Sequence, residues 1–78
     1  MPFYYFLWTD EIIQHLAAHD VSQEEFEEVV CDPDRVETSR SSDRFVALGY
    51  TVAGRYLACV YEMIDETTVL PVTGYEPD

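Results

Sequence analysis

The fold is decided by residues 45–64, which read FVALGYTVAGRYLACVYEMI. Nearly every position in the two halves of this stretch is apolar, which is typical of strands that are buried on both faces. Gly54 lies in the short break between the halves and can take the left-handed conformation that a tight turn requires. The stretch therefore predicts a hairpin of two central antiparallel strands, at residues 45–51 and 56–64.

Weaker strand signals lie on both sides of this hairpin. Residues 35–39 predict a weak strand, and we expect residues 40–43 to form a polar turn before the hairpin. Beyond the hairpin, residues 68–75 form a last strand. Pro71 favours an edge position for this strand, because proline has no N–H to donate to a neighbouring strand.

A strand and two helices precede these elements. The apolar run at residues 3–8 predicts a buried strand, and Thr9 after it is a good N-cap for a first helix. Ser22 and Glu25 have the spacing of a capping box, which predicts the start of a second helix. Pro33 ends that helix.

The predicted order is β-α-α-β-β-β-β, an α+β fold in which two helices pack on one face of an antiparallel sheet. We expect all 78 residues to form a single domain, residues 1–78, because the chain is too short for two. Two helices cover one face of the sheet and leave the other face exposed. We expect Tyr50, Tyr61 and Tyr75 to line that exposed face, where they would bind a partner or a second copy of the chain.

The charge of the chain excludes several classes of partner. Sixteen Asp and Glu oppose four Arg, with no Lys, and the net charge is −12. Such a chain repels nucleic acid and anionic membrane surfaces, and it suits a basic protein or a saline environment. No apolar run approaches a membrane-spanning length, and no secretory signal precedes Cys31 and Cys59. We therefore expect a cytoplasmic protein with reduced thiols.

The four arginines are all the permanently cationic side chains of the chain. Arg35, Arg40 and Arg44 surround one predicted turn, and Arg55 opens the next strand. Pairing with neighbouring carboxylates is the simplest role for them. The alternative is an anion site at one end of the sheet, with Arg40 among its binding residues.

A metal site is a weaker hypothesis. His15 and His19 lie four residues apart on the first predicted helix, a spacing that can bind zinc. No third ligand is evident, and the metalloprotease pattern HExxH is absent. Surface histidines are the simpler interpretation, so we expect no cofactor and no metal.

The sequence resembles the BrnT-type toxins, small members of the RelE-like superfamily. The resemblance covers nearly the whole chain and rests on short motifs in the same order: Trp8 at the end of the first strand, His19-Asp20-Val21-Ser22 between the helices, Asp32-Pro33 after the second helix, Arg44 and Gly49 bounding a strand, and Gly54-Arg55 before the next strand.

This resemblance implies a RelE-like fold and a ribonuclease toxin that a partner antitoxin neutralises. The resemblance implies that Arg44 and Arg55 correspond to cationic catalytic residues of the family. Family members have basic residues near the start of the first helix, where this chain has Asp10 and Glu11. Since RNA cleavage needs cations to hold the phosphate, we expect a non-catalytic, toxin-like domain that binds a protein partner, with a ribonuclease as the alternative.

Overall fold

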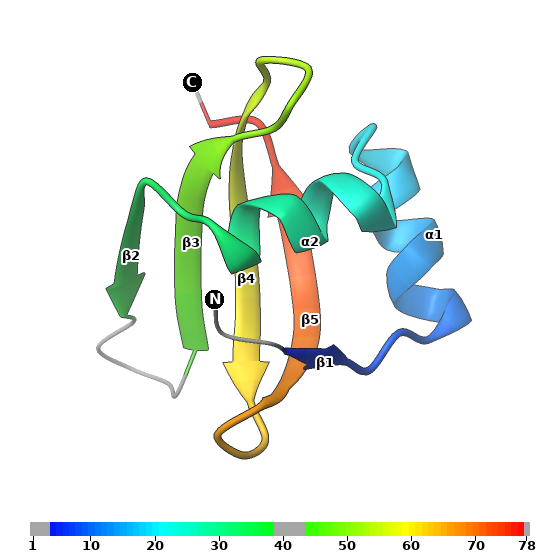
Figure 1. Cartoon of the computed structure of the whole chain (residues 1–78). Coiled ribbons are helices and arrows are strands. Elements are labelled where there is room, and N and C mark those ends of the chain that lie inside the picture. Colours follow the sequence, from blue (N-terminus) through cyan, green and yellow to red (C-terminus); the bar gives the residue numbers. More distant parts are fainter. Residues whose placement is uncertain (1–3, 39–43, 78) are drawn as a thin grey trace.

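The computed structural model describes residues 4–38 and 44–77 and contains two helices and a five-stranded sheet (Figure 1). This confirms the α+β class and the predicted order of elements. Along the chain the elements are β1 (Tyr5–Phe6), α1 (Asp10–Ala18), α2 (Gln23–Cys31), β2 (Arg35–Thr38), β3 (Arg44–Tyr50), β4 (Tyr56–Met63) and β5 (Thr68–Tyr75).

Both helices begin where the sequence predicts. The Thr9 hydroxyl accepts a hydrogen bond from the amide of Ile12 and caps α1. The capping box of α2 is complete, because Ser22 Oγ accepts from the Glu25 amide and the Glu25 carboxylate accepts from the Ser22 amide. No helix in the described part of the chain is long and apolar enough to cross a membrane.

The sheet is mixed, so the predicted all-antiparallel sheet is wrong at one strand. The order across the sheet is β1-β5-β4-β3-β2, and β1 runs parallel to β5. Only Tyr5 and Phe6 pair with β5, through bonds from the Tyr5 amide to the Thr67 carbonyl and from the Leu7 amide to the Val69 carbonyl. The strand predicted at residues 3–8 is therefore much shorter. Residue 3, like the turn predicted at residues 40–43, lies outside the described residues.

The prediction that Pro71 marks an edge strand is also wrong. β5 lies between β1 and β4, and Pro71 is almost completely buried. Two features of the sheet accommodate its missing N–H. β1 pairs only with Thr68 and Val69, so it does not reach Pro71. On the other side, Val60 pairs with Thr73 and Tyr61 with Pro71, so β5 carries a bulge at Val72, directly after Pro71.

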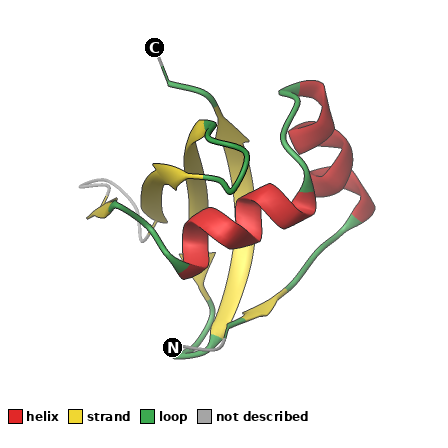
Figure 2. Ribbon diagram, turned by 45° about the horizontal axis from the view of Figure 1, so that its top comes forward, coloured by secondary structure: helices red, strands yellow, loops and turns green. Residues whose placement is uncertain are grey.

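The core lies between the sheet and the helices, as Figure 2 shows for α2, which crosses the sheet. Phe26, Val29 and Val30 point from α2 into this core, and Leu16 enters it from α1, which lies alongside β5 (Figure 1). The Leu16 side chain packs directly on the backbone of Gly74, where an added Cβ would lie 3.1 Å from it. This face of the sheet, which we call the inner face, is therefore closed by the helices.

Candidate functional site

The opposite side of the sheet is the strongest candidate for a functional surface. Within residues 4–38 and 44–77, no helix crosses it, and α1 reaches only its margin, where His15 Nε2 lies 2.8 Å from Thr73 Oγ1. Strand pairing and the alternation of side chains assign its members. We call it the outer face and define it by these residues: Tyr5, Arg35, Glu37, Arg44, Val46, Leu48, Tyr50, Tyr56, Ala58, Val60, Glu62, Thr68, Leu70, Thr73 and Tyr75.

Three tyrosines occupy one end of the outer face. Tyr50 and Tyr56 are direct cross-strand partners, and their ring centroids lie 4.8 Å apart. Tyr75 pairs with Ala58, two residues further along β4. Tyr50 is 64% exposed and Tyr75 is 41% exposed, so large rings from β3, β4 and β5 meet solvent here. Tyrosine combines a rigid apolar ring with a hydroxyl, which is why it is enriched in binding surfaces.

The middle of the outer face is apolar. Val46 and Val60 are cross-strand partners, and Leu48 pairs with Ala58 in the next outward position. Ala58 is almost completely buried, because the larger side chains around it shield its methyl group. Val46, Leu48 and Val60 are partly exposed. Together with the tyrosines they form one continuous apolar area across three adjacent strands.

Two ion pairs lie along the rest of the outer face. Arg44 and Glu62 face each other across β3 and β4, with 3.5 Å between Arg44 Nε and Glu62 Oε1. Arg35 and Glu37 pair along β2. All four side chains are substantially exposed, so each pair contributes little to stability. The two pairs do, however, leave the outer face with equal numbers of positive and negative groups.

A second cluster surrounds Arg55 at the end of β4 nearest the hairpin loop. Arg55 Nη1 donates to both carboxylate oxygens of Glu25, at 2.9 and 2.8 Å, and its Nε donates to Glu76 Oε1 at 2.9 Å. Asp20 Oδ2 lies 3.9 Å from the guanidinium. The hydrogen bond to Glu76 is the main cause that raises the pKa of Arg55, with Glu25 adding to it. Arg55 thus links α2, the hairpin and the C-terminal segment.

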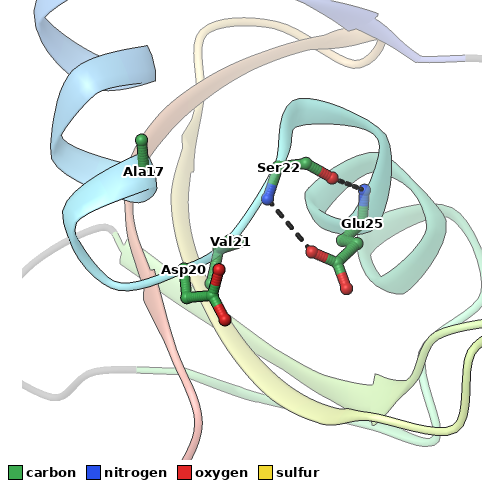
Figure 3. Close-up of a pocket in the computed structure, with 5 residues that line it drawn as sticks. All are labelled: Ala17, Asp20, Val21, Ser22 and Glu25. Carbon is green, nitrogen blue, oxygen red and sulfur yellow. Dashed lines mark hydrogen bonds between the residues drawn. The ribbon is translucent and has the colours of Figure 1, made fainter.

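A shallow hollow of about 230 Å³ lies beside this cluster and is lined by Ala17, Asp20, Val21, Ser22 and Glu25 (Figure 3). The figure shows the reciprocal bonds between Ser22 and Glu25 on one side of the hollow. Glu25 therefore serves the helix cap and Arg55 at once. Because the helix N-terminus already holds a carboxylate, an external anion would have to displace Glu25 to bind there.

The predicted site residues divide between several places. Tyr50 and Tyr75 lie on the outer face as expected. Tyr61 does not: it is 8% exposed and stacks on Phe45 within the inner face. Arg44 and Arg55 lie in separate ion-pair clusters, and Arg40 is outside the described residues.

The histidines and cysteines do not form a metal or nucleophile site in the described part of the chain. His15 Nε2 lies 2.8 Å from Thr73 Oγ1, and the rings of His15 and His19 are 5.1 Å apart. Among the described residues, no group of three or more potential ligands is placed to hold a metal. Cys31 and Cys59 are free thiols, and burial raises the pKa of both, that of Cys59 to about 12. A raised pKa keeps a thiol protonated and unreactive at neutral pH.

Sequence reasoning missed Tyr56 and the partners of Arg55. A hairpin that is symmetric about Ala53 pairs Tyr50 with Tyr56. The sequence therefore predicts this pair if Ala53 is taken as the centre of the loop. The contacts of Arg55 with Glu25 and Glu76 join residues 30 and 21 positions apart, and no local pattern indicates them.

No known protein family matches the sequence, and neither a characterised protein nor a solved structure shows significant similarity to it.

Proposed function

We propose that this chain is a non-catalytic, toxin-like interaction domain with a RelE-like fold, which binds a protein partner through the outer face. One observation carries the proposal: the outer face presents a continuous apolar and aromatic area over three strands, and nothing in the described residues covers it. Apolar area of this kind, bordered by charged side chains, is typical of protein-binding surfaces. The resemblance of its short sequence motifs to those of BrnT-type toxins favours a toxin–antitoxin type of system in the cytoplasm, in which the partner is either an antitoxin-like protein or a second copy of the chain.

The arrangement of Arg55 favours binding over catalysis. Its guanidinium donates to Glu25 and Glu76, both carboxylates of the same chain. To hold an RNA phosphate, Arg55 would have to leave these partners, and the phosphate would have to approach Asp20 as well. Arg44, the other candidate cation, lies in a separate pair with Glu62. Catalysis of phosphate transfer needs cations that converge on one point.

Affinity capture from the native host tests the binding proposal. The bait is the full chain, compared with a Tyr50→Ser/Tyr75→Ser variant. The matched control is Val52→Ser, because Val52 is 94% exposed but lies in the hairpin loop outside the outer face. We expect a specific partner with wild type and with the control, and its loss with the double variant. A partner that the double variant retains in full would contradict the proposal.

Expression in a bacterium tests the ribonuclease alternative directly. The readouts are growth and the integrity of cellular RNA. We expect neither to change. RNA cleavage by wild type that disappears in Arg44→Ala or in a correctly folded Arg55→Lys variant would replace the binding proposal with an enzymatic one.

A further inference from the structure

We propose that the outer face is occupied by a second copy of this chain, packed sheet against sheet about a two-fold axis. This rests on the proposed function and names the partner that it leaves open. A two-fold interface uses the same surface patch on both copies, so the patch must be compatible with itself in shape and charge. Three features of the outer face meet this requirement: its charge balance, its distance from the acidic segment, and its area.

The charge balance is the first feature. The outer face holds Arg35 and Arg44 beside Glu37 and Glu62, so these groups sum to zero in a chain whose net charge is −12. Because each outer face is neutral overall, two such faces do not repel each other when they come together. A strongly basic partner would gain little from this surface. Such a partner would bind the acidic helices instead.

The distance from the acidic segment is the second feature. Nine of the 16 carboxylates lie between Asp10 and Asp34, a segment without arginine or lysine. This segment includes α1 and α2, which pack on the inner face or beside β5. Packed layers are about 10 Å apart, so the two helical layers of a sheet-to-sheet dimer lie roughly 30 Å apart. That distance exceeds the Debye length of about 8 Å at physiological salt, and the repulsion between copies is therefore largely screened.

The area is the third feature. The five strands, of which the longest have eight residues, form the whole outer face. With strands about 4.8 Å apart and a rise of about 3.3 Å per residue, the face covers roughly 500 Å². Two copies together bury about 1,000 Å², which is the lower limit for a specific interface. We therefore expect a reversible dimer with a dissociation constant of about 1–100 µM.

Sedimentation equilibrium of the full chain tests this inference. Over about 5–500 µM protein we expect a monomer–dimer equilibrium that strengthens between about 0.05 and 0.5 M NaCl, since salt screens the residual repulsion. Tyr50→Ser/Tyr75→Ser should weaken the dimer by about tenfold or more, because aromatic residues dominate such interfaces. The control Val52→Ser should remain within about twofold of wild type. A chain that stays monomeric at every concentration and salt level overturns the inference.

Isotope-filtered NMR on a mixture of labelled and unlabelled wild-type chains locates the interface without any mutation. Contacts between copies that join Val60 or Leu48 methyl groups to a tyrosine ring support the inference. Contacts that involve Ala17 and Ala18, which are exposed on α1, place the interface elsewhere and overturn it. The two proposals fail separately: a monomeric chain whose host partner depends on Tyr50 and Tyr75 refutes the second copy but keeps the proposed function.

Discussion

Asp20 shows how a single residue shapes the turn between the two helices. Its φ angle is 61°, in the left-handed region, and its amide bonds the Ala17 carbonyl while the Val21 amide bonds the Leu16 carbonyl. These two bonds form a Schellman motif, and the buried Val21 and Leu16 belong to the same core cluster. Glycine is the residue that fits such a position without strain.

We predict that Asp20→Gly stabilises the fold by about 1 kcal/mol, because glycine removes the cost of the left-handed backbone. The Asp20 side chain is fully exposed and 3.9 Å from Arg55, so the ion pair that is lost contributes little. Urea denaturation measures the difference. Asp20→Asn is the matched control, since it removes the charge but keeps a side chain. A glycine variant no more stable than the asparagine variant would show that the backbone is not strained.

Cys59 should make the fold sensitive to alkali. Burial raises its pKa from 9.0 to about 12. Between these values the thiol ionises in the unfolded chain but stays protonated in the folded chain. The contribution of the protonated Cys59 thiol to the free energy of unfolding is complete below about pH 9. It is lost as the pH rises towards about 12, by about 1.4 kcal/mol per pH unit. Burial of Tyr61 raises its pKa and acts in the same direction.

Denaturation series from about pH 8 to 11 test this effect of Cys59. We expect Cys59→Ala to flatten the alkaline loss of stability and Cys31→Ala to retain most of it. An unchanged slope in Cys59→Ala would mean that other groups cause the loss.

Tyr61 marks the limit of prediction at the scale of the residue. Strand residues alternate between faces, so a tyrosine points inward or outward according to the register. Residues 56–64 are apolar at nearly every position, so the sequence does not show which alternate set of side chains faces the helices. Tyr61 pairs with Phe45 on the inner face, where both contact the core, whereas Tyr50 and Tyr56 pair on the outer face. Local sequence therefore identified the strand but not the face.

At the scale of the elements, Arg55 connects four segments that are distant in sequence. It joins the turn between the helices, the start of α2, the β3–β4 hairpin and the segment after β5. The side chains of Arg55 and Glu25 are 26% and 19% exposed, so solvent reaches this pair less than the other ion pairs of the described residues. A less exposed pair with two hydrogen bonds is stronger than an exposed one.

We predict that Arg55→Ala lowers the melting temperature far more than Arg35→Ala, because it leaves Glu25 without its cationic partner. Arg35→Ala is the matched control, since Arg35 is 65% exposed in its pair with Glu37. Arg55→Lys should lie between the two, because an ammonium cannot donate to both carboxylates in the same planar geometry. Thermal denaturation by circular dichroism measures all three. Equal melting temperatures for the two alanine variants would refute the linking role of Arg55.

The elements with strong local signals were the ones that the sequence predicted well. Both helix starts follow from side chains that cap them, and β5 spans the predicted residues 68–75. The pairing of β1 with β5 was not predictable, because it joins residues more than sixty positions apart through two backbone bonds. The edge position predicted from Pro71 was wrong for the same reason. A bulge and the short neighbouring strand β1 accommodate this proline, and both are properties of the assembled sheet.

At the scale of the whole molecule, charge is distributed unevenly. The helical segment holds most of the carboxylates, and pairs such as Glu24–Glu27 and Glu24–Glu28 lie at helical spacing. Each such pair destabilises the fold by about 0.2–0.5 kcal/mol at low salt. We therefore predict that the melting temperature rises over the first few hundred millimolar of NaCl, as the repulsion is screened. A melting temperature that falls with salt would mean that the arginine ion pairs outweigh this repulsion.

The central claim, that the outer face binds protein, is tested most directly by photo-crosslinking in the native host. A photoreactive phenylalanine analogue replaces Tyr50 on the outer face or, in the control, Glu24 on the exposed side of α2. We predict a discrete adduct from position 50, at twice the mass of the chain if the partner is a second copy, and no adduct from position 24. An adduct from position 24 alone, or none from position 50, would contradict the claim.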